Sequence, residues 1–220
     1  MAGFGLGLLF VAIWASAFTA IKGVVPEWPA LWGLAVRFAC VAPILLAVVA
    51  WRRALWKRKI GLGRGDAWRL AAMGVFGTAF YLAGAWKAST VLPSGLVALL
   101  SSTAPLFVAL GEVVVLRQRV PPLAWAGLGL GWLGVAVLGA GRGLSGVAAA
   151  ELWGVGLALG GALSQAAGIL AFAPARRRID PWTANAAQTT VAAATLLVLA
   201  GLAEPSLPPA PSPTLVLSLL

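Results

Sequence analysis

The chain has 220 residues, of which 61% are hydrophobic and only 10% are charged, and its formal net charge is +10. Soluble domains carry roughly 25% charged residues, so this composition excludes an ordinary soluble enzyme or binding domain. With no histidine and a single cysteine, Cys40, the chain also excludes Ser-His and Cys-His nucleophile pairs, histidine zinc sites and an intrachain disulfide. We therefore expect no enzyme and no cofactor.

Apolar segments long enough to cross a bilayer follow one another along the chain. A helix needs about 20 residues to cover the hydrocarbon core. The predicted spans are 3–25, 30–51, 70–86, 91–116, 123–140, 151–173 and 182–203, and an eighth begins near 213. None shows the short alternation of a membrane barrel strand. The sequence therefore predicts an all-α fold, a polytopic bundle of transmembrane helices.

The basic residues predict how the bundle is oriented. Twelve of the 16 basic residues fall in loops on one side: Arg52, Arg53, Lys57, Arg58, Lys59, Arg64, Arg69, Arg117, Arg119, Arg176, Arg177 and Arg178. Positively charged loops stay in the cytoplasm, so we expect an inner or plasma membrane protein whose amino terminus is cytoplasmic. Topology and contact with the lipid bilayer account for the charge, and we expect no nucleic acid partner.

A repeated pattern predicts an internal duplication. Gly5–Leu8 opens the first span and Gly154–Leu157 opens the sixth, and each copy is followed by a span with an early polar residue, Arg37 or Gln188. Five spans separate the copies, so the second copy must enter the membrane in the opposite sense. Inverted repeats of this kind are typical of alternating-access transporters.

Several short motifs resemble the EamA family of the drug/metabolite transporter (DMT) superfamily. They are Trp14-Ala15-Ser16-Ala17-Phe18, Lys22, Arg37-Phe38, Ala104-Pro105-Leu106-Phe107, Gly111-Glu112, Trp125-Ala126-Gly127, Gly134-Val135, Ala162-Leu163-Ser164-Gln165 and Asp180-Pro181. The resemblance implies ten helices in two inverted five-helix repeats, and export or exchange of small organic metabolites, amino acids among them.

On this pattern, residues 3–140 form the first repeat and residues 151–220 begin the second. Leu220 falls about seven residues into the eighth span, so the second repeat is incomplete in this chain. We expect either the missing C-terminal helices or a second copy of the chain, as a homodimer, to complete the bundle. The small-molecule metabolite is the other expected partner.

Arg37 is the most conspicuous polar residue within a span. An arginine inside the membrane costs about 2.5–3.5 kcal/mol on insertion scales, so it should face a cavity or a partner. Two interpretations remain: a clamp for a substrate carboxylate or phosphate, or an arginine that reaches the interface or bonds to neighbouring carbonyls. Lys22 and Lys87 lie nearer the outer interface, where a long side chain reaches water at little cost.

The fourth predicted span has small and polar residues along one face: Ser94, Ala98, Ser101, Ser102, Pro105, Ala109 and Glu112. Pro105 cannot donate to the carbonyl of Ser101, so the helix should bend there. The alternatives are a helix that lines the pathway and a seam of small residues that packs against a neighbour. We predict that the substrate site contains Trp14, Arg37, Tyr81, Ser101, Ser102, Pro105, Gln165 and Gln188.

These features predict an inner-membrane secondary transporter that works by alternating access. A membrane receptor or scaffold, or a channel formed by an oligomer, remain the alternatives. An inverted repeat has no evident use in a receptor, whereas the sequence does not exclude a channel. For Glu112 we expect an ion pair with Arg117 or Arg119 at the helix end.

Overall fold

The computed structural model describes residues 5, 7, 9, 21, 23–56, 63–117, 121–140, 149–206, 208–213 and 215, and all regular structure in this part of the chain is helical. The elements are α2 (Ala30–Trp56), α3 (Asp66–Ala72), η1 (Met73–Phe80), α4 (Tyr81–Val91), α5 (Ser94–Ser101), α6 (Ala104–Val114), α7 (Pro122–Ala140), α8 (Ala149–Phe172) and α9 (Pro181–Ala203). The all-α prediction is confirmed.

Two predicted spans differ in detail from the structure. The third, 70–86, lies within a longer helical rod that runs from Asp66 to Val91, and the middle of this rod, η1, is a π-helix of eight residues. The fourth is interrupted: α5 ends at Ser101 and α6 begins at Ala104, next to Pro105. The interruption lies one turn before Pro105, where proline removes one amide donor and crowds the preceding turn.

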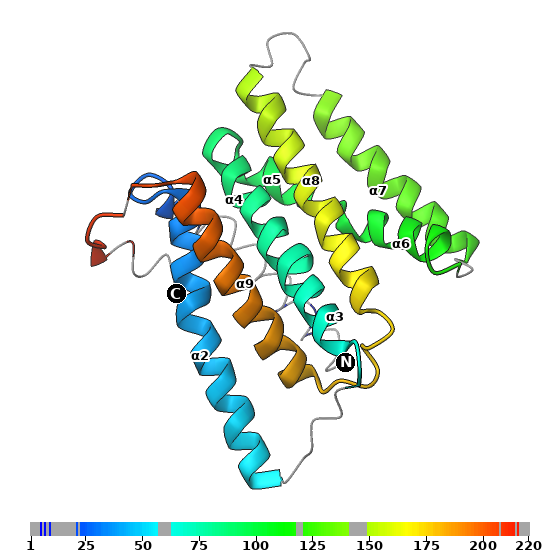
Figure 1. Ribbon diagram of the computed structural model, residues 1–220. Coiled ribbons are helices and arrows are strands. Elements are labelled where there is room, and N and C mark those ends of the chain that lie inside the picture. Colours follow the sequence, from blue (N-terminus) through cyan, green and yellow to red (C-terminus); the bar gives the residue numbers. More distant parts are fainter. Residues whose placement is uncertain are drawn as a thin grey trace.

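The helices lie side by side in a fixed order (Figure 1). Helix α9 lies between α2 and the continuous rod α3–η1–α4, and α8 covers the other side of that rod. Leu31 at the start of α2 contacts Glu204 after the end of α9, whereas Arg52 near the end of α2 lies over the Trp182 ring at the start of α9. Helices α2 and α9 therefore run antiparallel along their whole length.

Glycines allow the closest approach in the bundle, between α8 and the rod η1–α4. A Cβ added at Gly168 would lie 2.6 Å from the Cα of Gly77, and one at Gly161 would lie 2.8 Å from the carbonyl oxygen of Tyr81. A Cβ at Gly84 would meet the carbonyl of Leu157. Small residues at such positions let helix backbones touch, which is how membrane helices gain van der Waals contact.

The outward faces of the helices are apolar, as expected of a protein surrounded by lipid. Leu123 on α7 is 84% exposed and Leu202 on α9 is 79% exposed. Four helical stretches in the described residues are long and apolar enough to cross a membrane: 30–55, 94–114, 151–172 and 181–203. The protein is therefore a multi-pass membrane protein, because lipid-exposed backbone must be hydrogen-bonded within helices.

Candidate functional site

Two irregular elements lie about halfway between the two ends of the helix bundle. The first is the π-helix η1. It packs against α8 on one side and α9 on the other. The hydroxyl of Ser164 on α8 donates a 2.9 Å hydrogen bond to the carbonyl oxygen of Phe76 in η1. π-helical turns disturb the regular backbone ladder and occur frequently at functional sites, so this contact marks a specialised stretch of the third span.

The break between α5 and α6 is the second irregular element. The hydroxyls of Ser102 and Thr103 turn back to the carbonyls of Leu99 and Leu100, each at 2.6 Å. Ser101 and Thr103 are buried, whereas Ser102 and Pro105 are exposed in the described part of the bundle. The predicted polar face is therefore split, because the chain changes direction between Ser101 and Ala104.

The two irregular elements lie at the same depth. Helices α4 and α5 form a hairpin whose turn is Leu92–Pro93, and Tyr81 and Ser101 lie about 15 Å down its two arms. Tyr81 is 3% exposed and Ser101 is 4% exposed. The Tyr81 phenol lies close enough to the Ser101 hydroxyl to interact with it, yet without hydrogen-bond geometry, so Ser101 Oγ has no hydrogen-bond partner in the described residues.

The other predicted site residues are distributed over the bundle. Gln165 follows Ser164 on α8 and therefore lies near η1. Gln188 on α9 donates a 2.9 Å hydrogen bond to the side chain of Asn185 one turn earlier. Arg37 on α2 is partly exposed and makes no ion pair or hydrogen bond within the described part of the chain. Trp14 lies outside the described residues.

Arg37 and Gln188 are not at the same depth. Arg37 lies six residues along α2 from Leu31, and Gln188 lies six residues along α9 from Trp182, at the opposite end of the antiparallel pair. At 1.5 Å per residue they are about 13 Å apart along the helix axes. The structure thus brings Tyr81 and Ser101 together, with Gln165 nearby, but separates Arg37 from Gln188.

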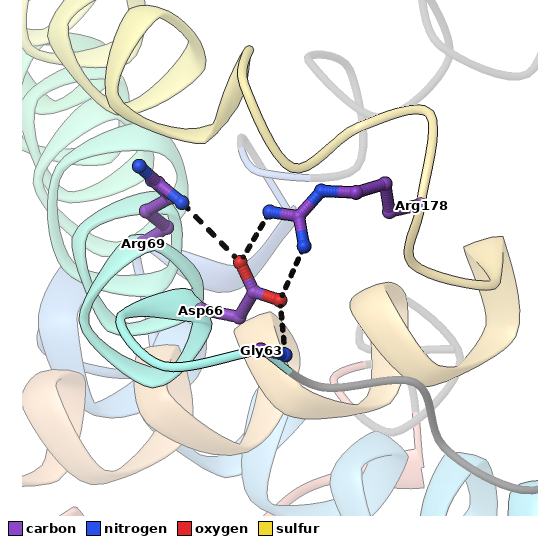
Figure 2. Close-up of polar contacts among 4 residues, drawn as sticks. All are labelled: Gly63, Asp66, Arg69 and Arg178. Carbon is purple, nitrogen blue, oxygen red and sulfur yellow. Dashed lines mark hydrogen bonds and ion pairs between the residues drawn. The ribbon is translucent and has the colours of Figure 1, made fainter.

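One end of the bundle is held by Asp66, the first residue of α3 (Figure 2). Its carboxylate accepts hydrogen bonds from the backbone N–H of Gly63 at 2.7 Å, from Arg178 at 2.9 and 3.3 Å, and from Arg69 at 3.3 Å. Gly65, with a φ of 88°, makes the left-handed turn that lets the chain fold back onto this carboxylate. We call this end the Asp66 end.

Asp66 remains ionised well below neutral pH. The hydrogen bond from the Gly63 amide holds the pKa of the Asp66 carboxyl below its usual value of 3.8, and Arg178 and Arg69 add to this effect. Burial of the side chain opposes the shift without cancelling it. The cluster is therefore a charged contact between α3 and the segment that joins α8 to α9.

The opposite end of the bundle is held by Glu204, immediately after α9. Its carboxylate accepts hydrogen bonds from the backbone N–H of Leu31 at 2.9 Å and of Trp32 at 3.3 Å, and from Lys87 Nζ at 2.7 Å. The Trp32 indole in turn donates a 2.8 Å hydrogen bond to the Glu204 carbonyl oxygen. One residue thus joins α9 to α2 and α4, and we call this the Glu204 end.

Asp66, Glu204 and Ser164 join helices, although the sequence around them does not indicate this role. Lys87 was interpreted as reaching the interface, whereas it forms an ion pair with Glu204. One signal was present: Pro29 precedes α2 and offers no side-chain acceptor for the first amides, so a cap had to come from elsewhere. The ion pair expected for Glu112 is not formed with Arg117, and Arg119 lies outside the described residues.

The described residues contain no group of three or more histidine, cysteine, aspartate or glutamate side chains that could hold a metal ion. Their polar residues at mid-depth are hydroxyls and amides, and the charged clusters lie at the two ends. This arrangement offers hydrogen bonds to a small polar solute at mid-depth.

Comparison with known proteins identifies the family. The "EamA-like transporter family" matches residues 1–140. The chain is also similar to an "Uncharacterized transporter" of Archaeoglobus fulgidus, with 31% identity over 132 residues, which cover 59% of this chain and 45% of that protein. The match therefore spans less than half of the relative, and no solved structure matches significantly. Because the family covers more than half of the residues, the chain belongs to the EamA-like transporter family.

Proposed function

We propose that the protein is a secondary transporter that exports or exchanges small organic metabolites, such as amino acids, by alternating access. The observation that carries this proposal is the pair of charged clusters at opposite ends of the bundle: Glu204 joins the end of α9 to α2 and α4, and Asp66 joins α3 to the segment between α8 and α9. A carrier must be able to open either end while the other stays closed. Separate clusters at the two ends provide contacts that can break independently.

The antiparallel pair of α2 and α9 supports the inverted repeat. Helix α2 is the second span of the predicted first repeat, and α9 is the second span of the predicted second repeat. The two helices begin at opposite ends of the bundle, as inverted copies must. The family match ends at residue 140, where the sequence pattern places the end of the first repeat.

Charge distribution supports the proposed orientation in the inner membrane. The exposed or partly exposed basic residues Arg53, Arg64, Arg176 and Arg177 all lie at the Asp66 end, in or beside the loops that flank α3 and α9. By the positive-inside rule we assign this end to the cytoplasm and the Glu204 end to the opposite side.

The substrate would bind at mid-depth, beside the two irregular helices. Transporter sites are commonly built where helices are interrupted, because the backbone there offers hydrogen-bonding groups to a solute. Ser101 has a buried hydroxyl without a hydrogen-bond partner in the described residues, and Tyr81, Gln165, Ser102 and Pro105 lie near it in space or in the chain. Arg37 lies closer to the Glu204 end and would attract an anionic group on its way to this site.

Counterflow of radiolabelled amino acids into proteoliposomes tests the proposal. We expect uptake against preloaded substrate for the parent protein, and at least a roughly tenfold loss of uptake of acidic amino acids for Arg37→Ala, the order of one charge-assisted hydrogen bond. Arg37→Lys should retain part of the uptake of acidic amino acids, because the charge remains but the bidentate geometry is lost. Arg53→Ala, at the other end of α2, is the matched control and should transport normally. Absence of counterflow for every amino acid tested with the parent protein would refute transport of this class.

A further inference from the structure

We propose that Glu204 is the latch of the extracytoplasmic end. Its carboxylate holds α2 and α4 against α9, and the substrate pathway opens to the extracytoplasmic side only when these bonds break. This inference rests on the proposed alternating access and adds the residue that controls one of the two openings.

Helix α2 has no cap of its own. Pro29 precedes its first residue, and the first turn contains no acidic side chain. The first amides of a helix have no partner within the helix and must be satisfied from outside. Glu204 Oε2 satisfies the amides of Leu31 and Trp32 although it lies 173 and 172 positions further along the chain. Capping of α2 therefore depends on the docking of α9.

The capping is reciprocal. The carbonyl of Glu204 lies at the C-terminal end of α9, where the last carbonyls lack helical partners, and the Trp32 indole donates to it. The positive end of the α2 dipole thus meets a carboxylate and the negative end of the α9 dipole. Lys87 of α4 adds a third element through Glu204 Oε1 at 2.7 Å. If α9 moved away, all four bonds would be lost together.

The surroundings of Glu204 favour a releasable contact. Its side chain is 9% exposed, whereas that of its partner Lys87 is 39% exposed, so the ion pair is open on one side. One turn further into the bundle, the contact consists of small apolar side chains such as Ala35 and Ala200, both fully buried. Pro205 follows Glu204 and ends the helix. Any movement of the segment after α9 therefore acts directly on the carboxylate.

Labelling of single cysteines tests the latch without using transport. In a Cys40→Ser background, Ala200→Cys reports on the Glu204 end and Ala175→Cys on the Asp66 end, because both positions are 0% exposed. The reagent is a charged maleimide, applied to the protein in nanodiscs. We expect Glu204→Gln to increase the labelling rate at Ala200→Cys about tenfold, the order expected for one lost charge-assisted hydrogen bond. The rate at Ala175→Cys should not change.

Controls separate a latch from a general weakening of the fold. Glu151→Gln makes the same substitution at an exposed acid at the start of α8, at the same end, and should leave both rates unchanged. Lys87→Gln should increase labelling at Ala200→Cys by less than Glu204→Gln does, because the cap on α2 remains. If Ala200→Cys itself perturbs packing, Ala35→Cys on α2 replaces it.

Two results for Glu204→Gln would overturn the latch: no increase in the labelling rate at Ala200→Cys, or an equal increase in the labelling rate at Ala175→Cys. Both can be read whether or not the protein transports amino acids. Failure of counterflow with a selective increase in labelling would refute the proposed substrate class and leave the latch standing. Counterflow of amino acids without a selective increase in labelling would refute the latch and leave the proposed substrate class standing.

Discussion

The Glu204 end and the Asp66 end each depend on one carboxylate, but the partners of the two carboxylates come from different distances along the chain. Two of the partners of Asp66, Gly63 and Arg69, lie within three residues of it. Every side-chain partner of Glu204 lies more than 100 residues away. The Asp66 cluster is thus partly complete when α3 has formed, whereas the Glu204 cluster exists only when the predicted repeats have docked.

This difference has an energetic consequence. When the contact at the Asp66 end separates, Asp66 keeps its two local donors and loses only Arg178. When the contact at the Glu204 end separates, α2 loses its cap, Lys87 loses its counter-ion and Glu204 loses every donor described above. We therefore expect the Asp66 end to open more readily than the Glu204 end.

The largest effect is expected between the two ends, at the close glycine contact of α8 with η1. In Gly168→Ala the new methyl group would meet the backbone of Gly77, which cannot move aside as a side chain can. We expect a loss of about 3 kcal/mol in the free energy of unfolding, measured by thermal unfolding in detergent. Gly160→Ala, on the same helix with open space around it, should be neutral or slightly stabilising, because alanine is the better helix former. Equal stability of the two variants would contradict the tight backbone contact between Gly168 and Gly77.

The second prediction compares the two carboxylates directly. Glu204→Ala should destabilise the protein by about 2 kcal/mol, because it removes a helix cap and leaves Lys87 without its counter-ion. Asp66→Asn should lower the melting temperature less, since the asparagine side chain still accepts the Gly63 amide. Thermal unfolding of both variants in the same detergent measures the difference. A larger fall for Asp66→Asn would reverse the proposed order of the two ends.

The third prediction concerns the long-range part of the Asp66 cluster. Arg178 donates through both terminal nitrogens to both oxygens of Asp66, a geometry that lysine cannot reproduce. Arg178→Lys should therefore increase labelling at Ala175→Cys several-fold and leave Ala200→Cys unchanged. Arg177→Lys, an exposed neighbour on the same loop, is the control and should change neither rate. If Arg178→Lys raised the labelling rate at Ala200→Cys instead, Arg178 would not act on the Asp66 end as proposed.

The smallest effect is expected from pH. The pKa of folded Asp66 lies below 3.8, so the folded state binds fewer protons than the unfolded state near that pH. Its stabilising contribution is therefore complete above pH 3.8 and is lost only as the pH falls through the lower, folded value. Labelling at Ala175→Cys should be constant from about pH 9 to about pH 5, after correction for thiol ionisation. A step within that range that Asp66→Asn removes would show that the carboxyl titrates there.

The fold was largely predictable because its main determinants are local. A run of about 20 apolar residues is sufficient to predict a membrane helix. Pro105 has no amide donor of its own, and the fourth span is interrupted just before it, between Ser101 and Ala104. Asp180 and Pro181 lie at the N-terminal boundary of α9 and cap it within the same few residues. The π-helix was not predicted, since Met73–Phe80 has the composition of any apolar helix.

The contacts between the helices were less predictable. Glu204 looked like an ordinary loop residue, because nothing within ten positions of it shows that it caps α2. Arg69 and Arg178 looked like solvated loop cations, although both bind the same buried carboxylate. Pairings of this kind depend on how helices are placed in space, which hydrophobic runs do not specify. The roles proposed for Arg37, Tyr81, Ser101, Ser102, Pro105, Gln165 and Gln188 in substrate binding remain predictions.

The contacts at the two ends of the rod α3–η1–α4 also limit the length that this rod can have. Asp66 at one end and Lys87 at the other are both engaged with partners outside this rod, so the rod cannot turn about its axis without breaking one of them. Deleting a single residue from the α-helical part of the rod, α3 or α4, would rotate everything beyond it by about 100° relative to everything before it. Evolution can therefore change the side chains of this segment far more easily than it can change the number of residues.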